Sequence, residues 1–228
     1  YLYSLMFGLI PLCSGIVALS GAKLWGGFKT SVGKTVIFMG LGIFLWGCGD
    51  MVWAYYNFVL DISAPYPSLA DIGFAPGIFF YSLGVVFLAD AAGAKYGLKN
   101  TFAKMFVVVA PLAILLLSYF ALIGVARGGV LVPTGDTTLK TILDIAYPLG
   151  DFLGLTIAVL ISGLSFRYMG EKYMLEIAAI LAGLAVMFIA DFMFSYTTTV
   201  GTFYNGNFVD LTLTIGTFLL SFGVLGFS

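Results

Sequence analysis

Long apolar stretches alternate with short polar breaks along almost the whole chain. An apolar stretch of about 20 residues is the length that an α-helix needs to cross a bilayer. The breaks are rich in glycine, proline and asparagine, which favour turns, and the runs lack the period-two alternation of a β-barrel. The pattern therefore predicts seven membrane-spanning helices, at residues 2–22, 35–58, 70–91, 105–126, 139–164, 176–197 and 208–228.

The composition agrees with this interpretation and removes several classes of protein. The chain has 228 residues, of which 61% are hydrophobic and 9% charged, whereas soluble domains are about 45–50% apolar and about 25% charged. A water-soluble globule of this size could not bury so much apolar surface. The net charge of −1 provides no basic face for a nucleic-acid partner. We expect an all-α polytopic membrane protein, a single domain over residues 1–228, with the lipid bilayer as its main partner.

The sequence contains no histidine and only two cysteines. Bis-histidine haem, His-ligated zinc and a Ser-His-Asp triad are therefore excluded. Cys13 and Cys48 lie in apolar stretches, where we interpret them as small hydrophobic residues and not as a disulfide or redox pair. We therefore expect no haem and no metal centre. Because no connection is long enough to hold a catalytic domain, we also expect no enzymatic activity.

Basic residues are concentrated in three of the six predicted connections. The first, third and fifth connections hold eight of the ten lysines and arginines. Since basic connections face the cytoplasm, we expect a cell-membrane protein with its N-terminus outside and its C-terminus inside. These residues are Lys23, Lys29, Lys34, Lys95, Lys99, Lys104, Arg167 and Lys172.

Aspartates recur at matched positions of the predicted spans. Asp71, Asp144 and Asp210 open the third, fifth and seventh spans, and each is followed six residues later by glycine. Asp50 and Asp191 occupy matching positions in the second and sixth spans. We infer one leading helix and three pseudo-repeated hairpins, at residues 35–91, 105–164 and 176–228. Two Gly-x-x-x-Gly pairs predict close helix packing, namely Gly73 with Gly77 and Gly150 with Gly154.

Asp50, Asp151 and Asp191 lie within spans, toward the outer face. A charge at membrane depth costs about 2.5–3.5 kcal/mol, and no span interior offers a lysine or arginine. Each acid must therefore be protonated, hydrogen-bonded or paired with a bound cation. Aromatic residues crowd the same level, which is typical of an interfacial belt but also suits a cationic or polyhydroxylated ligand. They are Trp53, Tyr55, Tyr56, Tyr66, Tyr147, Tyr196 and Tyr204.

Three short strings carry a resemblance to a known group of membrane regions. They are Pro67-Ser68-Leu69-Ala70-Asp71, Tyr147-Pro148-Leu149-Gly150-Asp151, and the hairpin from Asp191 through Tyr196 to Asp210. They resemble the multi-span input region found ahead of diguanylate cyclase and histidine kinase domains in bacteria and archaea. The resemblance covers about residue 50 onward. It implies a sensory role, with ligand recognition at Asp71, Tyr147, Asp151, Asp191, Tyr196 and Asp210.

No output domain follows the seventh span, so we expect signalling through a membrane or cytoplasmic partner, a second copy, or a further domain. A retinal pigment is excluded, because the seventh span has no lysine for a Schiff base. We expect a membrane-embedded sensory module with an outward acidic and aromatic pocket that takes a cation or a small cationic or polar ligand. A proton- or cation-coupled transport subunit and a structural anchor of a larger complex are the alternatives. The candidate ligand-binding residues are Asp50, Asp71, Tyr147, Asp151, Asp191, Tyr196 and Asp210.

Overall fold

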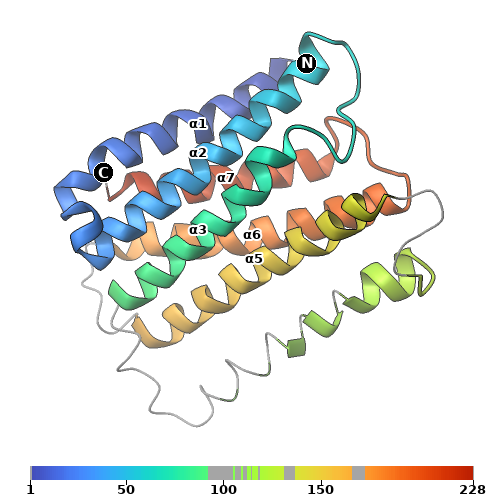
Figure 1. The fold of residues 1–228 in the computed structure, drawn as a ribbon. Coiled ribbons are helices and arrows are strands. Elements are labelled where there is room, and N and C mark those ends of the chain that lie inside the picture. Colours follow the sequence, from blue (N-terminus) through green and yellow to red (C-terminus); the bar gives the residue numbers. More distant parts are fainter. Residues whose placement is uncertain are drawn as a thin grey trace.

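The computed structural model describes residues 2–91, 105, 109, 112–113, 115–117, 119–130, 137–165 and 173–227. All regular secondary structure in this part of the chain is helical, which confirms the all-α class there. Figure 1 shows the long helices side by side in an elongated bundle. In chain order the elements are α1 (Leu2–Gly21), η1 (Ala22–Trp25), η2 (Gly27–Lys29), α2 (Ser31–Phe58), α3 (Asp71–Ala91), the π-helix η4 (Phe120–Ala126), α5 (Thr138–Ser165), α6 (Met174–Thr199) and α7 (Phe208–Leu225).

Five of the described helices are long and apolar enough to cross a membrane. They correspond to the first, second, third, sixth and seventh predicted spans, and their ends agree with the prediction to within a few residues. The predicted fifth span coincides with α5, which has 28 residues. Seven residues of the predicted fourth span, 105–126, lie outside the described residues, and its continuous described part is the π-helix η4. A membrane protein is thus supported, whereas the number of seven spans stays a prediction.

The outer surface of the bundle is apolar, as lipid contact requires. On α7, large apolar side chains between 45% and 66% exposed recur every three or four residues, while the opposite face is buried in the bundle. A helix that is apolar on all sides is typical of a membrane span. The exposed stripe consists of Phe208, Leu211, Ile215, Phe218 and Phe222.

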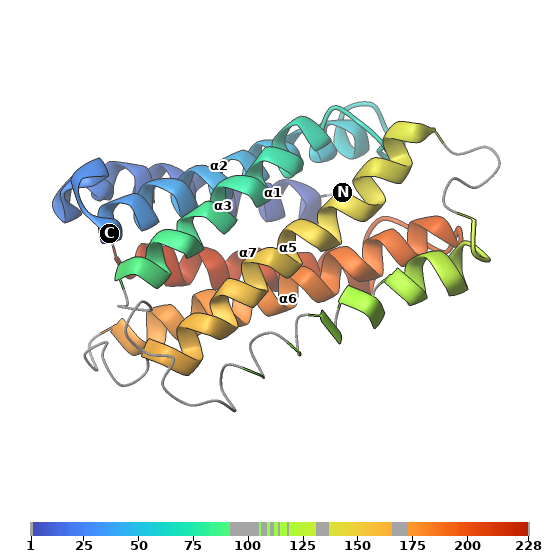
Figure 2. The ribbon, with the colours of Figure 1, turned by 60° about the horizontal axis from the view of Figure 1, so that its bottom comes forward.

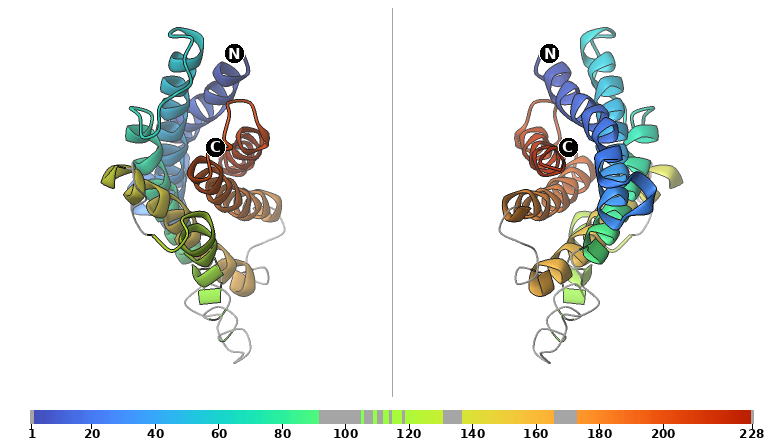
Figure 3. Two further views of the ribbon diagram at one scale, coloured as in Figure 1. Left: turned by 90° about the vertical axis from the view of Figure 1, so that its right-hand side faces the viewer. Right: turned by 90° about the vertical axis from the view of Figure 1, so that its left-hand side faces the viewer.

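Six of the described helices form a closed ring. Each is packed against its neighbour in the order α1, α2, α3, α5, α6 and α7, and α7 contacts α1 to close the ring. Figure 2 and Figure 3 show this arrangement from the side and along the bundle. The pairs α2–α3 and α6–α7 are the first and third predicted hairpins. The first helix of the middle hairpin is described only in part, so the threefold repeat stays a prediction.

Small residues allow the backbones of neighbouring helices to approach closely. A Cβ atom at Gly73 of α3 would lie 2.6 Å from the backbone nitrogen of Gly49 in α2. A Cβ atom at Gly150 of α5 would lie 2.5 Å from Cγ2 of Ile78 in α3. The predicted role of the glycine pairs in packing is therefore confirmed. Both cysteines are free thiols, also as expected.

Aromatic contacts join three elements at the end of the bundle where α7 finishes. The indole N–H of Trp25 donates a hydrogen bond to the backbone carbonyl of Phe227. The Tyr173 ring stacks on Phe227 at a centroid distance of 5.3 Å and meets Trp25 edge-on at 5.6 Å. The first connection, the start of α6 and the end of α7 are thereby held together.

Candidate functional site

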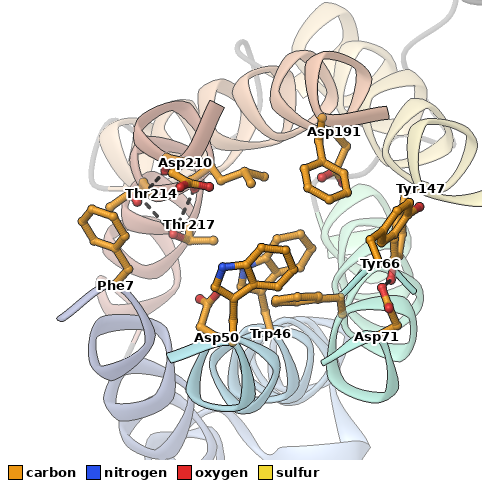
Figure 4. A pocket seen from close by; sticks show the side chains of 14 residues that line it. Phe7, Trp46, Asp50, Tyr66, Asp71, Tyr147, Asp191, Asp210, Thr214 and Thr217 are labelled. Carbon is orange, nitrogen blue, oxygen red and sulfur yellow. Dashed lines mark hydrogen bonds between the residues drawn. The ribbon is translucent and has the colours of Figure 1, made fainter. Parts of the chain in front are cut away.

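A cavity of about 70 Å³ lies inside the ring of helices, toward the end where α1, α3 and α7 begin (Figure 4). One water molecule needs about 10–15 Å³ of such space, so the cavity has room for several waters or a small ligand. All six helices of the ring and the connection between α2 and α3 contribute to its wall. The lining residues are Phe7, Trp46, Asp50, Trp53, Tyr66, Asp71, Phe74, Tyr147, Asp191, Phe194, Asp210, Leu213, Thr214 and Thr217.

The wall combines acidic with aromatic side chains. Four carboxylates come from four different helices, namely Asp50 from α2, Asp71 from α3, Asp191 from α6 and Asp210 from α7. The described lining residues include no lysine and no arginine. Nor do the described residues contain a group of three His, Cys, Asp or Glu side chains that could hold a metal ion. The cavity is therefore suited to a positive or hydrogen-bond-donating group and not to an anion.

Asp71 is fixed by hydrogen bonds to both of its carboxylate oxygens. The backbone N–H of Ser68 donates to Oδ2 at 2.6 Å, and the N–H of Ala70 donates to the Ser68 hydroxyl at 3.2 Å. This reciprocal arrangement resembles a capping box and explains why α3 begins here. The Tyr147 hydroxyl donates to Oδ1 of Asp71 and so ties α5 to α3. The Ser68-x-x-Asp71 spacing is a sequence signal for this cap.

Asp210 occupies a similar position at the start of α7. The Asn207 side chain caps this helix by accepting from the N–H groups of Val209 and Asp210, at 2.8 and 3.3 Å. The backbone N–H of Gly206 donates to the Asp210 carboxylate. Two of the aspartates expected to open spans therefore act as carboxylates at helix N-termini, where the helix dipole favours a negative charge.

Asp50 faces the same cavity from α2 but differs from Asp71 and Asp210 in its contacts. Among the described residues, no hydrogen bond and no ion pair is found for its carboxylate. Asp50 and Asp210 are close enough for their charges to repel each other, and their helices are in contact. Two carboxylates therefore face one cavity without a basic side chain between them.

Asp191 and Asp50 lie at equal depth in their helices. Each precedes the last residue of its helix by eight residues, or about 12 Å along the axis. Asp191 is 4% exposed. The Phe194 ring, on the same face of α6, meets the rings of Tyr66 and Phe203 edge-on, each at a centroid distance of 5.0 Å. Such edge-to-face pairs hold the aromatic wall of the cavity in a fixed geometry.

Asp144 has a different role from the one that its repeat position suggested. We expected it to open the fifth span, but α5 begins at Thr138, and Asp144 is inside the helix and buried. The guanidinium of Arg127 forms an ion pair with its carboxylate, and the two side chains are 1% and 2% exposed. Sequence spacing did not reveal this pair, because Arg127 lies in a polar connection that folds back onto α5.

Tyr66 connects this ion pair with the cavity. Its ring lines the cavity, and it lies outside the long helices, in the connection between α2 and α3. Burial, and to a smaller extent the neighbouring Asp144 carboxylate, raise the pKa of Tyr66 well above its ordinary value. The hydroxyl therefore stays protonated near neutral pH and remains a hydrogen-bond donor.

Five of the seven candidate ligand-binding residues line the cavity, namely Asp50, Asp71, Tyr147, Asp191 and Asp210. Tyr196 is not among the lining residues. It follows Asp191 by five residues, which turns it by about 140° around the helix, whereas Phe194 stays on the same face. The side chain of Asp151 lies outside the described part of the chain.

Five of the seven aromatic residues named at this level fall into two groups. Trp53, Tyr66 and Tyr147 line the cavity, whereas Tyr55 and Tyr204 are 51% and 68% exposed. The exposed pair fits an interfacial belt. The sequence interpretation missed several other lining residues, because nothing in an apolar span distinguishes them from ordinary core positions. They are Phe7, Trp46, Phe74, Phe194, Leu213, Thr214 and Thr217.

Comparison of the chain with protein-family models, with curated proteins and with solved structures found no match. The function must therefore be argued from the chemistry of the cavity.

Proposed function

We propose that this chain is a membrane-embedded sensory module whose cavity binds a small ligand from the outer side of the cell membrane. The observation that carries the proposal is the convergence of Asp50, Asp71, Asp191 and Asp210 on one cavity whose described wall has no basic side chain. Carboxylates at membrane depth are costly and usually mark functional sites.

The contrast with Asp144 supports a ligand role for the cavity acids. Asp144 is neutralised by Arg127 within the protein, as a structural acid in a bilayer should be. The acids of the cavity have aromatic and hydroxyl neighbours instead. For Asp50, which has no hydrogen bond or ion pair among the described residues, a bound ligand that carries positive charge or donates hydrogen bonds would provide the missing compensation.

The charge distribution favours an outward-facing cavity. Lys23 and Lys29 lie in the first connection and Lys34 in the first turns of α2, at the end of the bundle opposite to the cavity. Because basic residues accumulate on the cytoplasmic side, the cavity end would face outward. Lys95, Lys99, Lys104, Arg167 and Lys172 lie outside the described residues.

Helix α7 offers a route by which binding could reach the inner face. Near its start it contributes Asp210, Thr214 and Thr217 to the cavity, and Phe227, directly beyond its end, contacts Trp25 and Tyr173. A ligand held between α2 and α7 would bias the packing of these helices, and a rigid α7 would transmit the shift. The signal would pass to a partner protein, a second copy or a further domain, in line with the resemblance to bacterial and archaeal input regions.

A transport subunit is the second candidate, because Asp50 has no hydrogen-bond or ion-pair partner among the described residues and could carry a proton or cation. Flux measurements in proteoliposomes under a pH or sodium gradient distinguish the two functions. Flux that is lost in Asp50→Asn would favour transport, whereas binding without flux would favour the sensor.

The proposal is tested by screening small metabolites for thermal stabilisation of the purified chain in lipid nanodiscs. A ligand at 100 times its Kd stabilises the folded state by about 2.7 kcal/mol. We expect at least one compound to stabilise the wild type and Asp61→Asn but not Asp210→Asn. Asp61 is an exposed residue with φ of 52°, a backbone conformation that asparagine also tolerates. If no compound distinguishes Asp210→Asn from the wild type, the proposal is wrong.

A further inference from the structure

The carboxylates of the cavity differ in how far the protein already satisfies them. Both oxygens of Asp71 accept hydrogen bonds, from Ser68 and Tyr147. Asp210 accepts one from Gly206. The carboxylate of Asp50, by contrast, has no hydrogen bond or ion pair among the described residues, although it faces the cavity. The side of the cavity formed by α2 and α7 is therefore where a ligand is needed most.

The two hydroxyl groups that α7 contributes to the wall near Asp210 accept hydrogen bonds but have none to give. The Thr214 hydroxyl donates to the backbone carbonyl of Asp210 at 2.7 Å, and the Thr217 hydroxyl donates to that of Leu213 at 3.1 Å. With their single hydrogens engaged, both hydroxyls present only lone pairs. A polyhydroxylated ligand needs both donors and acceptors, whereas a cation needs acceptors alone. The sequence left these two ligand classes open, and the two threonine hydroxyls, which offer acceptors alone, favour the cation.

Charge balance leads to the same class of ligand. Asp50 and Asp210 line the same cavity, so a negative charge on one disfavours a negative charge on the other, and repulsion between like charges grows as the surroundings become less polar. A cation between the two carboxylates would convert this repulsion into attraction toward both. A metal ion is less suitable, because the described residues provide no group of three metal-binding side chains.

The aromatic neighbours of Asp50 indicate an organic cation. Trp46 and Trp53 lie four residues before and three residues after Asp50 on the same face of α2, and both line the cavity. Figure 4 shows Trp46 beside Asp50, with Phe7 on the side of Asp210. The face of an indole ring attracts organic cations more strongly than other aromatic faces do. Apolar groups around a charged nitrogen would find matching surface here.

We propose that the cavity binds a small organic ammonium ion, with its nitrogen between Asp50 and Asp210 and its carbon atoms against Trp46, Trp53 and Phe7. This proposal rests on the proposed function, because it names the ligand class of the same cavity. Asp71, which already accepts two hydrogen bonds, then serves to position Tyr147 and α5 rather than to hold the charge.

The test measures binding to the full chain in nanodiscs by titration calorimetry and tryptophan fluorescence, with choline, tetramethylammonium and methylammonium as probes. The control ligand is 3,3-dimethylbutan-1-ol, which has the shape of choline without its charge, and sodium chloride controls for ionic strength. We expect at least one ammonium ion to bind at least tenfold more tightly than the neutral alcohol. Sodium chloride at the same ionic strength should give no saturable signal.

Three variants assign the site. Asp50→Asn and Trp46→Leu should each weaken binding of the ammonium ion at least tenfold, while Asp61→Asn should bind as the wild type does. Helical circular dichroism and a single elution peak establish that each variant is folded. If Asp50→Asn does not fold, Asp210→Asn replaces it with the same expected loss.

The inference is overturned if none of the three ammonium ions binds, if the neutral alcohol binds equally well, or if Asp61→Asn weakens binding as much as Asp50→Asn does. If the ammonium ions fail while compounds from the metabolite screen still bind in a manner that depends on Asp210, the ligand class is wrong and the proposed function stands. If neither experiment detects binding that depends on the cavity, both proposals fail.

Discussion

Replacement of Arg127 by methionine removes the positive charge that neutralises Asp144 inside the bundle. The side chains of the pair are 1% and 2% exposed, so water and salt screen the interaction little. Methionine retains much of the apolar stem by which an arginine packs. The substitution therefore tests mainly the charge and its hydrogen bond, with limited loss of packing.

The expected magnitude follows from the burial of Asp144. Removal of one partner from a buried ion pair costs about 3–5 kcal/mol. The isolated carboxyl can limit this cost by binding a proton, which at pH 7 requires about 4 kcal/mol for an ordinary carboxyl group. We expect the free energy of unfolding to fall by about 3–4 kcal/mol at pH 7. Because the folded variant then holds a proton that the unfolded chain releases, the loss should shrink by about 1.4 kcal/mol for each pH unit toward pH 5.

Unfolding with sodium dodecyl sulfate in bicelles, followed by circular dichroism at pH 7, 6 and 5, measures these losses. The double variant Arg127→Met/Asp144→Leu removes both charges and should recover most of the stability. A single-variant loss below about 1 kcal/mol, or a loss that is the same at all three pH values, would refute the reasoning.

Three other substitutions test separate contacts of the bundle. Tyr147→Phe removes the donor to Asp71 and should lower the free energy of unfolding by about 1–3 kcal/mol in the same titration; an unchanged midpoint would mean that this bond contributes nothing. Gly42→Ala puts a methyl group 2.5 Å from the backbone nitrogen of Tyr81. Because this pushes α2 away from α3, the free energy of unfolding should fall by about 1–3 kcal/mol; an unchanged melting temperature would contradict this expectation. Trp25→Phe removes the indole donor to the backbone carbonyl of Phe227 and should accelerate amide hydrogen exchange at the end of α7. Equal exchange rates in the variant and the wild type would disprove that Trp25 holds this end of the helix.

The helices are the part of this protein that the sequence determines. A continuous apolar run in a bilayer must satisfy its backbone hydrogen bonds internally, so its length and its polar ends give the span directly. The ends depend on nearby residues as well. The capping hydrogen bonds of Ser68 and Asp71 at α3 and of Asn207 at α7 join groups only a few residues apart. Local patterns of this kind can be recognised without knowledge of the rest of the fold.

The chemistry of the cavity was predictable only in part. The rarity of acids in apolar spans drew attention to Asp50 and Asp191, and both line the cavity. Their neighbours Trp46, Phe74 and Phe194 carry no such signal. A span that is apolar on all sides has no periodicity that distinguishes the face toward lipid from the face toward the protein.

Only the tertiary structure decided which of the similar aspartates share a site. Asp71, Asp144 and Asp210 look equivalent along the chain, yet Asp71 and Asp210 face the cavity while Asp144 is paired with Arg127. The difference arises from how each helix is rotated and from where the connection that precedes α5 folds back. Both depend on packing between different segments of the chain, so the residue spacing within one segment could not reveal them.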